Sequence, residues 1–173
     1  MKVINVITGL LLCAAGPACA HIVLEQKSAP AGSYYKATFM VGHGCEGSPT
    51  TGITIDLPVA MAVVKPMPKS GWQLATETMA PPQPMTLHGR AVEQVVRQVQ
   101  WQGGNLADAH YDEFVLLLQL PAQAGPLYFK VLQQCAAGRS EWTQIPQPGG
   151  GRLPYPAAVL EVLPVAPPKH HHH

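Results

Sequence analysis

Charged residues are scarce in this sequence, and the two signs cancel. Only 12% of the 173 residues are Asp, Glu, Lys or Arg, and 11 basic residues stand against 10 acidic ones. Nucleic acids and anionic membrane surfaces attract proteins with a marked excess of positive charge. The composition therefore argues against both as partners.

The sequence also lacks long apolar runs beyond residue 20, where none approaches the roughly 20 residues of a membrane-spanning helix. We therefore expect no membrane span there. A shorter apolar run covers residues 3–12, after the basic Lys2 and before Ala18-Cys19-Ala20, which resembles a signal peptidase site. This pattern predicts a secretory signal peptide over residues 1–20 and export to the periplasm or cell envelope.

Removal of residues 1–20 leaves 153 residues, enough for one domain with its own core. We assign residues 21–165 to this domain and residues 166–173 to a flexible Pro/His tail. The four histidines that end the tail are either native or a purification tag. In both cases they form a secondary metal-binding segment outside the fold.

Cysteine is rare. Four cysteines occur, and two of them, Cys13 and Cys19, fall within the predicted signal peptide. The remaining pair, Cys45 and Cys135, would reach an oxidising compartment, where two thiols most often form one disulfide. An alternative is that Cys19 is lipidated, but the position where a lipobox normally has leucine is glycine here. In that case His21 would not be N-terminal.

Short β-branched and aromatic segments, separated by Gly and Pro, fill the rest of the chain, and no convincing amphipathic helix interrupts them. Residues 92–101 alone could pass for a helix, but their strand neighbours favour a strand. We expect eight or nine short strands in a single-domain β-sandwich. The candidate segments are 22–24, 34–41, 52–58, 62–66, 72–77, 92–101, 114–120, 127–134, 142–146 and 158–163.

The residue that would follow cleavage is His21. A histidine with a free α-amino group can hold one metal ion through the amine and ring Nδ1 together, which an internal histidine cannot do. Cu(II) favours such tetragonal sites of nitrogen and oxygen over other first-row divalent ions. His21 is therefore a candidate Cu(II) ligand, although a histidine can also follow a cleavage site by chance.

Several segments occur in an order and spacing that resemble one known family, the YcnI-like copper-binding proteins of the periplasm or cell surface. The resemblance covers nearly all of the chain after residue 20 and implies an immunoglobulin- or fibronectin-like sandwich. Its segments are His21, residues 30–34 (PAGSY), the Glu46 loop, residues 65–72 (KPMPKSGW), 101–106 (WQGGNL), 112–114 (DEF), 128–129 (YF), 134–142 and the closing strand.

The resemblance also implies a metal site, a brace with one histidine that holds one Cu(II) per chain. Carried over, the amine and ring of His21 bind the ion, Glu46 supplies an oxygen, and Trp142 lies against the metal. A protonated indole nitrogen is a donor only, so Trp142 would shield the ion rather than bind it. This chain has Gly-His-Gly-Cys before the glutamate, unlike many relatives, which makes His43 a candidate auxiliary ligand.

Three functions compete. The first is an exported, non-enzymatic Cu(II)-binding protein that stores copper or passes it to a periplasmic chaperone or importer. The second is a histidine-brace copper oxygenase, which would need a second histidine, and the nearest candidate is His43. The third is a metal-free sandwich for adhesion or interaction, which would leave the terminal histidine without a purpose. We favour the first.

Overall fold

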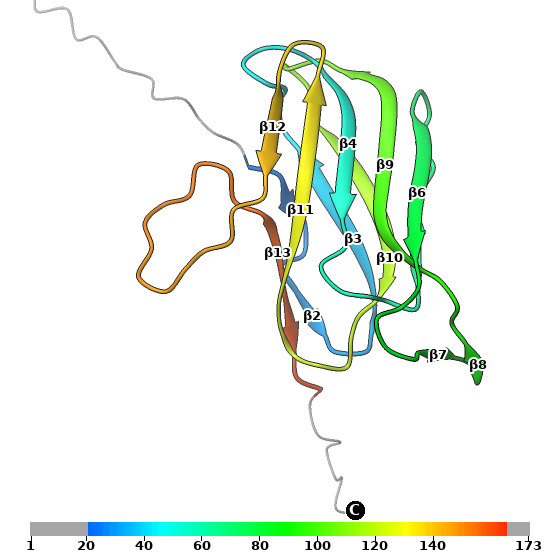
Figure 1. The fold of residues 1–173 in the computed structure, drawn as a ribbon. Helices are drawn as coiled ribbons and strands as arrows, with labels where there is room; N and C mark the ends of the chain where they lie inside the picture. The colour runs from blue at the N-terminus through cyan, green and yellow to red at the C-terminus, as the bar shows by residue number, and fades with distance from the viewer. Residues whose placement is uncertain (1–20, 166–173) are drawn as a thin grey trace, which may run out of the picture.

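The computed structural model describes residues 21–165, and the predicted signal peptide and tail lie outside the described residues (Figure 1). This range contains strands and no helix, and hence no helix that could cross a membrane. The strands are β1 (Val23–Leu24), β2 (Ser28–Pro30), β3 (Tyr34–Val41), β4 (Thr50–Asp56), β5 (Val64–Pro66), β6 (Gln73–Met79), β7 (Thr86–Leu87), β8 (Arg90–Ala91), β9 (Val95–Leu106), β10 (Asp112–Gln119), β11 (Gly125–Cys135), β12 (Arg139–Trp142) and β13 (Ala158–Leu163).

Two sheets form the sandwich. One has the order β1-β3-β10-β5, and the other has the order β2-β13-β11-β4-β9-β6, with β12 paired to β11. Strands β7 and β8 form a separate hairpin. The predicted single-domain β-sandwich is confirmed, although the described strands outnumber the eight or nine that we expected because several are only two or three residues long.

The core lies between the sheets and follows from the alternation of side chains along each strand. In β13, for example, burial alternates at every residue. Aromatic rings join the two layers, since Phe39 of β3 and Phe129 of β11 pack edge to face with ring centroids 5.4 Å apart. Both rings are fully buried, so the layers are fixed against each other at this point.

Strand β11 organises one end of the second sheet because it has different partners along one edge. Residues 125–129 pair with β13, residues 131–134 pair with β12, and the opposite edge pairs with β4 (Figure 1). The chain therefore leaves β12, forms the orange loop of residues 143–157, and returns to the same edge of β11 as β13. This route places the end of β12 beside the start of the described chain.

Some predicted boundaries were wrong. Residues 28–30 lie outside every predicted strand, but they form β2, which pairs in parallel with β13. We expected a strand over residues 92–101, but β9 begins at Val95 and continues through Gly103 and Gly104 to Leu106. A Cβ atom on Gly104 would lie 2.1 Å from the Trp72 ring. This glycine therefore makes room for the indole to pack on β9, and it does not end the strand.

The strand predicted at residues 142–146 lies earlier in the chain, because β12 ends at Trp142. Beyond it only Gln144 forms a bridge, with Pro156. The two-residue strands β7 and β8 were not predicted, since their pairing is a property of a local hairpin and not of a long alternating pattern.

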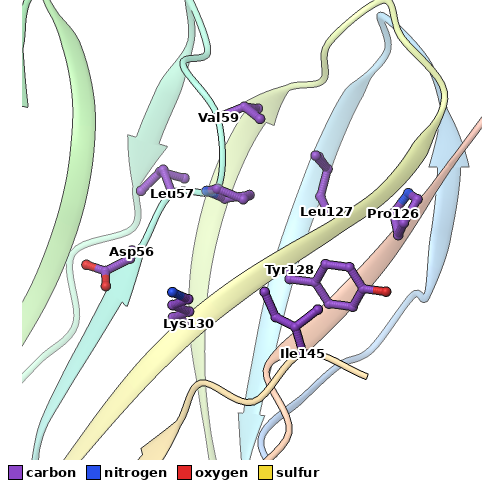
Figure 2. A pocket seen from close by; sticks show the side chains of 9 residues that line it. Asp56, Leu57, Val59, Pro126, Leu127, Tyr128, Lys130 and Ile145 are labelled. Atoms are coloured by element: carbon purple, nitrogen blue, oxygen red, sulfur yellow. The ribbon is translucent and has the colours of Figure 1, made fainter. Parts of the chain in front are cut away.

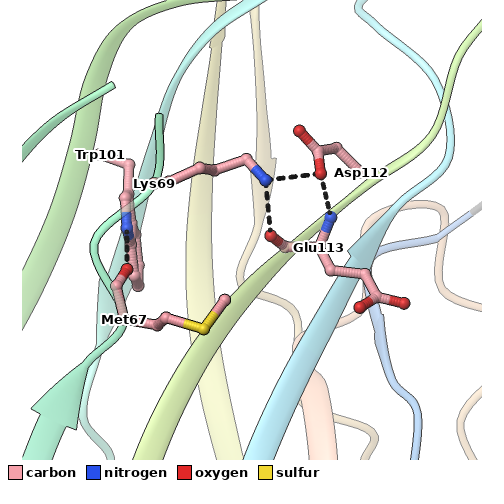
Figure 3. A network of polar contacts seen from close by, with 5 residues as sticks. All are labelled: Met67, Lys69, Trp101, Asp112 and Glu113. Atoms are coloured by element: carbon pink, nitrogen blue, oxygen red, sulfur yellow. Dashed lines mark hydrogen bonds and ion pairs between the residues drawn. The ribbon is translucent and has the colours of Figure 1, made fainter. Parts of the chain in front are cut away.

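The segment at residues 65–72 has a structural role in this fold. The Lys69 ammonium forms an ion pair with Asp112 at 2.5 Å and donates to the Glu113 carbonyl at 3.1 Å (Figure 3). The Trp101 indole N–H donates to the Met67 carbonyl at 3.0 Å. Trp101 is fully buried in the core, and Trp72 is half-buried and packs against the core.

Candidate metal centre

His21 lies at the edge of the sandwich, and the residues after it hold it there. Ile22 and Leu24 are only 2% and 1% exposed, and β1 pairs with β3. The His21 ring, itself half-buried, packs edge-on against the indole of Trp142, with ring centroids 5.9 Å apart and an interplanar angle of 61°. The structure therefore brings together two of the predicted site residues that are 121 positions apart.

Trp142 ends β12 and is 1% exposed. Its Nε1–H donates to the side-chain oxygen of Gln133 at 2.9 Å, and Tyr155 packs on it with ring centroids 5.3 Å apart. A buried indole with its only donor satisfied is rigid and offers no lone pair to a metal. The Trp142 indole can therefore pack beside a metal ion at His21, but it cannot bind that ion.

The loop after β3 contributes a second imidazole. The ring of His43 also packs edge-on against Trp142, with centroids 6.2 Å apart and an interplanar angle of 68°. The Gly44 N–H donates to the Asp108 carboxylate at 2.9 Å. A Cβ atom on Gly44 would lie 1.8 Å from the Ser48 carbonyl oxygen, so the close turn of this loop requires glycine.

Glu46 lies at the tip of that loop. Cys45 and Ser48 exchange two backbone hydrogen bonds of 3.0 and 2.9 Å, and the two residues between them, Glu46 and Gly47, have φ values of 51° and 85°. Positive φ at both central positions is the signature of a type I′ turn. The Glu46 side chain is exposed, and within residues 21–165 it forms no ion pair or hydrogen bond. Glu46 therefore shares a loop with His43, and no hydrogen bond or ion pair joins its side chain to His21.

The predicted disulfide is confirmed. Cys45 and Cys135 are joined with a Cα–Cα distance of 6.0 Å, across 90 positions of sequence. The bridge ties the loop of His43 and Glu46 to the end of β11, next to the hairpin that leads into Trp142. It therefore fixes two loops that carry candidate site residues relative to each other.

Sequence reasoning missed Gln133. This side chain is fully buried, and its amide N–H₂ donates to the His43 carbonyl at 2.7 Å and to the Thr50 hydroxyl at 2.8 Å. With the bond from Trp142 it makes three hydrogen bonds. The signal was present in the alternation of β11, where Leu127, Phe129 and Val131 face inward and the next inward position is a glutamine.

Comparison with known proteins places this sandwich in a family. A family model described as "Domain of unknown function (DUF1775)" matches residues 21–162, which is most of the chain. The chain belongs to the DUF1775 family. This family is the YcnI-like family that the sequence resembles, so the resemblance is confirmed at the level of the family.

One solved structure shares the fold of this DUF1775 chain. An uncharacterized protein from Nocardia farcinica, whose crystal structure reveals an immunoglobulin-like fold, has a TM-score of 0.65 at 22% identity, covering 82% of this chain and 97% of its own. The seventh ScaB type I cohesin from Pseudobacteroides cellulosolvens has a TM-score of 0.37 at 8% identity, over 88% of this chain and 97% of its own, and supports no argument. No curated protein matches the sequence.

The remaining polar candidates of this DUF1775 chain lie elsewhere. His88 and His110 are exposed. Within the described part of the chain, no three His, Cys, Asp or Glu side chains converge to hold a metal ion. A brace needs fewer side chains, because its first residue supplies two donors. The side chains alone therefore do not make a complete site in this DUF1775 protein.

Two surface hollows complete the description. One, of about 460 Å³, is lined by charged and apolar residues that include Asp56, Tyr128 and Lys130 (Figure 2). The other, of about 220 Å³, adjoins His21 and is lined by β1 and residues 156–159. The second hollow leaves space next to the candidate metal centre of this DUF1775 chain.

Proposed function

We propose that this chain is an exported protein of the periplasm or cell envelope that binds one Cu(II) ion in copper homeostasis. It stores the ion or passes it to another periplasmic copper chaperone or to a copper importer, and it catalyses no reaction. The observation that supports this proposal best is the packing of the His21 ring against the buried Trp142 indole at the start of the folded domain.

The donor set fits Cu(II). After removal of residues 1–20, His21 supplies its α-amino nitrogen and ring Nδ1, and Glu46 supplies a carboxylate oxygen whose charge offsets that of the ion. Glu46 is exposed on a two-residue turn, so its side chain is free to rotate toward an ion that His21 holds. Trp142 would cover one side of the site. The bound Cu(II) ion would itself be the cargo that the protein stores or passes on.

The α-amino group is the critical donor in this proposal. Because no three ligating side chains converge within residues 21–165, a loss of the amine removes a donor that no neighbouring side chain replaces. The export signal and the metal site are therefore linked, since cleavage after Ala20 is what creates the amine.

The test compares two proteins that both lack residues 170–173, so that the histidine tail cannot bind copper. One begins at His21 and the other carries one additional alanine before it, each released from a removable fusion and checked by mass spectrometry. Titration against a competing Cu(II) chelator should show one tight site in the first protein. Loss of a residue that only supports a metal ligand lowers metal affinity by up to about 100-fold. The second protein loses a ligand itself, so it should bind Cu(II) at least about 100-fold more weakly than the first. Equal affinities would contradict the proposal.

A further inference from the structure

Strand β6 forms the longest free edge of the sandwich. It is the last strand of the larger sheet and pairs only with β9 (Figure 1). It has seven residues, whereas the other edge strands of the two sheets, β1, β2, β5 and β12, have two to four. Strands β2 and β5 also contain proline, which has no backbone N–H to donate. Among the described edges, β6 is therefore the one best suited to accept a further strand.

The outer side of β6 presents unpaired backbone groups. Within residues 21–165, the backbone of residues 73–79 forms no hydrogen bond apart from its pairing with β9. Because the N–H and C=O groups of successive residues point to opposite edges of a strand, a row of them faces outward here. Proteins commonly block such an edge with lysine or proline, and β6 contains neither. This edge is open to strand addition.

The part of β6 that can accept a strand is short and well defined. Residues 73–77 pair in unbroken register with residues 98–102, and the register shifts between Glu77 and Thr78. A bulge of this kind bends the strand and disrupts the ladder. The straight segment is therefore residues 73–77, and Ala75 is at its centre.

A second copy of the same segment is complementary to this edge. When two copies pair in antiparallel about a two-fold axis at Ala75, Gln73 of each copy faces Glu77 of the other. Gln73 is exposed, and its amide forms no hydrogen bond within the described part of the chain. The Glu77 carboxylate already forms an ion pair with Arg97, so its charge is balanced, and the amide of the second copy can donate to it as well. No like charges face each other in this register.

The inward side chains also match in this register. Leu74 and Thr76 pair with Trp101 and Val99, which are fully buried, so both point to the inward face of the sheet. Leu74 of one copy then faces Thr76 of the other, and each can cover apolar surface that the edge leaves open. The residue on the axis is an exposed alanine, which is too small to hold the two strands apart.

We propose that this chain forms a reversible two-fold dimer in which the β6 strands of two copies pair in antiparallel about Ala75. The contact is self-complementary, as two-fold symmetry requires, and it joins the two larger sheets into one. Five residues from each strand make a small interface, and small interfaces are typical of weak association. Trp142 lies on β12, which pairs with β11 and not with β6, so the inference does not depend on the proposed function.

The first experiment measures association of the protein that begins at His21, with a metal chelator present so that the histidine tail cannot link copies. Sedimentation equilibrium over a range of concentrations gives the mass and the dissociation constant. Ala75→Lys and Ala75→Glu each place two like charges opposite each other on the axis, which is unfavourable across a strand pair. An equimolar mixture of the two variants places opposite charges there. Circular dichroism checks that both variants are folded.

The second experiment tests the register. In Ala75→Cys the two introduced thiols face each other across the axis, within the Cα separation that a disulfide spans. The control is Val159→Cys, which introduces an exposed cysteine into the same sheet on β13, separated from β6 by β11, β4 and β9. Both folded proteins are treated with a mild oxidant, and the covalent dimer is followed by electrophoresis without reductant.

We expect the parent to show a monomer–dimer equilibrium. Each charged variant should dimerise at least about fivefold more weakly, and the mixture should recover the affinity of the parent. Ala75→Cys should form the covalent dimer faster than Val159→Cys. A parent that stays monomeric at every concentration, a dimer that neither charge weakens, or equal cross-linking of the two cysteine variants would overturn the proposal. The mass of the parent needs no variant, so it decides even if a variant does not fold.

Discussion

The buried amide of Gln133 provides a quantitative test of how the candidate centre is held together. Its three hydrogen bonds join β11 to Trp142, to Thr50 and to the loop of His43, at 2.7 to 2.9 Å. In Gln133→Leu the side chain keeps a similar size, but the three partner groups lose their bonds in a buried environment.

The magnitude follows from the count of bonds. A neutral hydrogen bond contributes about 0.5 to 1.5 kcal/mol net, so the loss of three corresponds to about 1.5 to 4.5 kcal/mol. The partner groups would be left buried without a hydrogen bond, which favours the upper part of this range. The apolar leucine offsets some of this loss. We expect the free energy of unfolding to fall by about 2 to 4 kcal/mol. Thr50→Val removes one bond of the three and should cost about 1 kcal/mol.

Urea denaturation followed by far-UV circular dichroism measures both variants, and an unchanged m-value would show that only stability changed. The matched control is Gln134→Leu, the exposed neighbour of Gln133 on the same strand. It should remain within about 0.5 kcal/mol of the parent. If Gln133→Leu were equally neutral, the hydrogen bonds of this amide would not hold the centre together, and our account of the site's rigidity would be wrong.

Further predictions concern the disulfide, the two other site residues and alkaline pH. Replacement of Cys45 and Cys135 by alanine should lower the unfolding free energy by up to about 4 to 5 kcal/mol, from the 90-residue separation, and should weaken Cu(II) binding, as urea and chelator titrations can show. Glu46→Gln should keep the fold but weaken Cu(II), because the charge is lost; an unchanged affinity would remove Glu46 from the donor set. Trp142→Phe should alter the electron paramagnetic resonance spectrum of bound Cu(II) more than it lowers the fraction of protein that binds the ion. Complete loss of binding would show that Trp142 is required for binding and does not only cover the ion. Burial raises the pKa of Tyr35 to about 12. The unfolded chain then ionises first, so stability should fall between about pH 10 and 12, and a flat pH profile would contradict this.

Local patterns were sufficient for much of the fold. The alternating segments of β3 and β13 were predicted to the residue because one face of each strand must be apolar to reach the core. The disulfide followed from compartment and count, since only Cys45 and Cys135 remain after the predicted signal peptide. Short strands such as β2 escaped prediction because their pairing partner, β13, lies more than 100 residues away.

The candidate centre divides in the same way. The chemistry of His21 could be read from the sequence alone, because a chelate with the α-amine depends only on where cleavage occurs. The position of His43 and the role of Gln133 could not, since both depend on which strands lie side by side. Pairing of β12 with β11 brings Trp142 and Gln133 together, and the disulfide brings the His43 loop to them. Such contacts across about 90 residues have no local signature. The sequence by itself therefore determined which residues are candidate donors, and the tertiary structure decided that the rings of His21 and His43 share one indole.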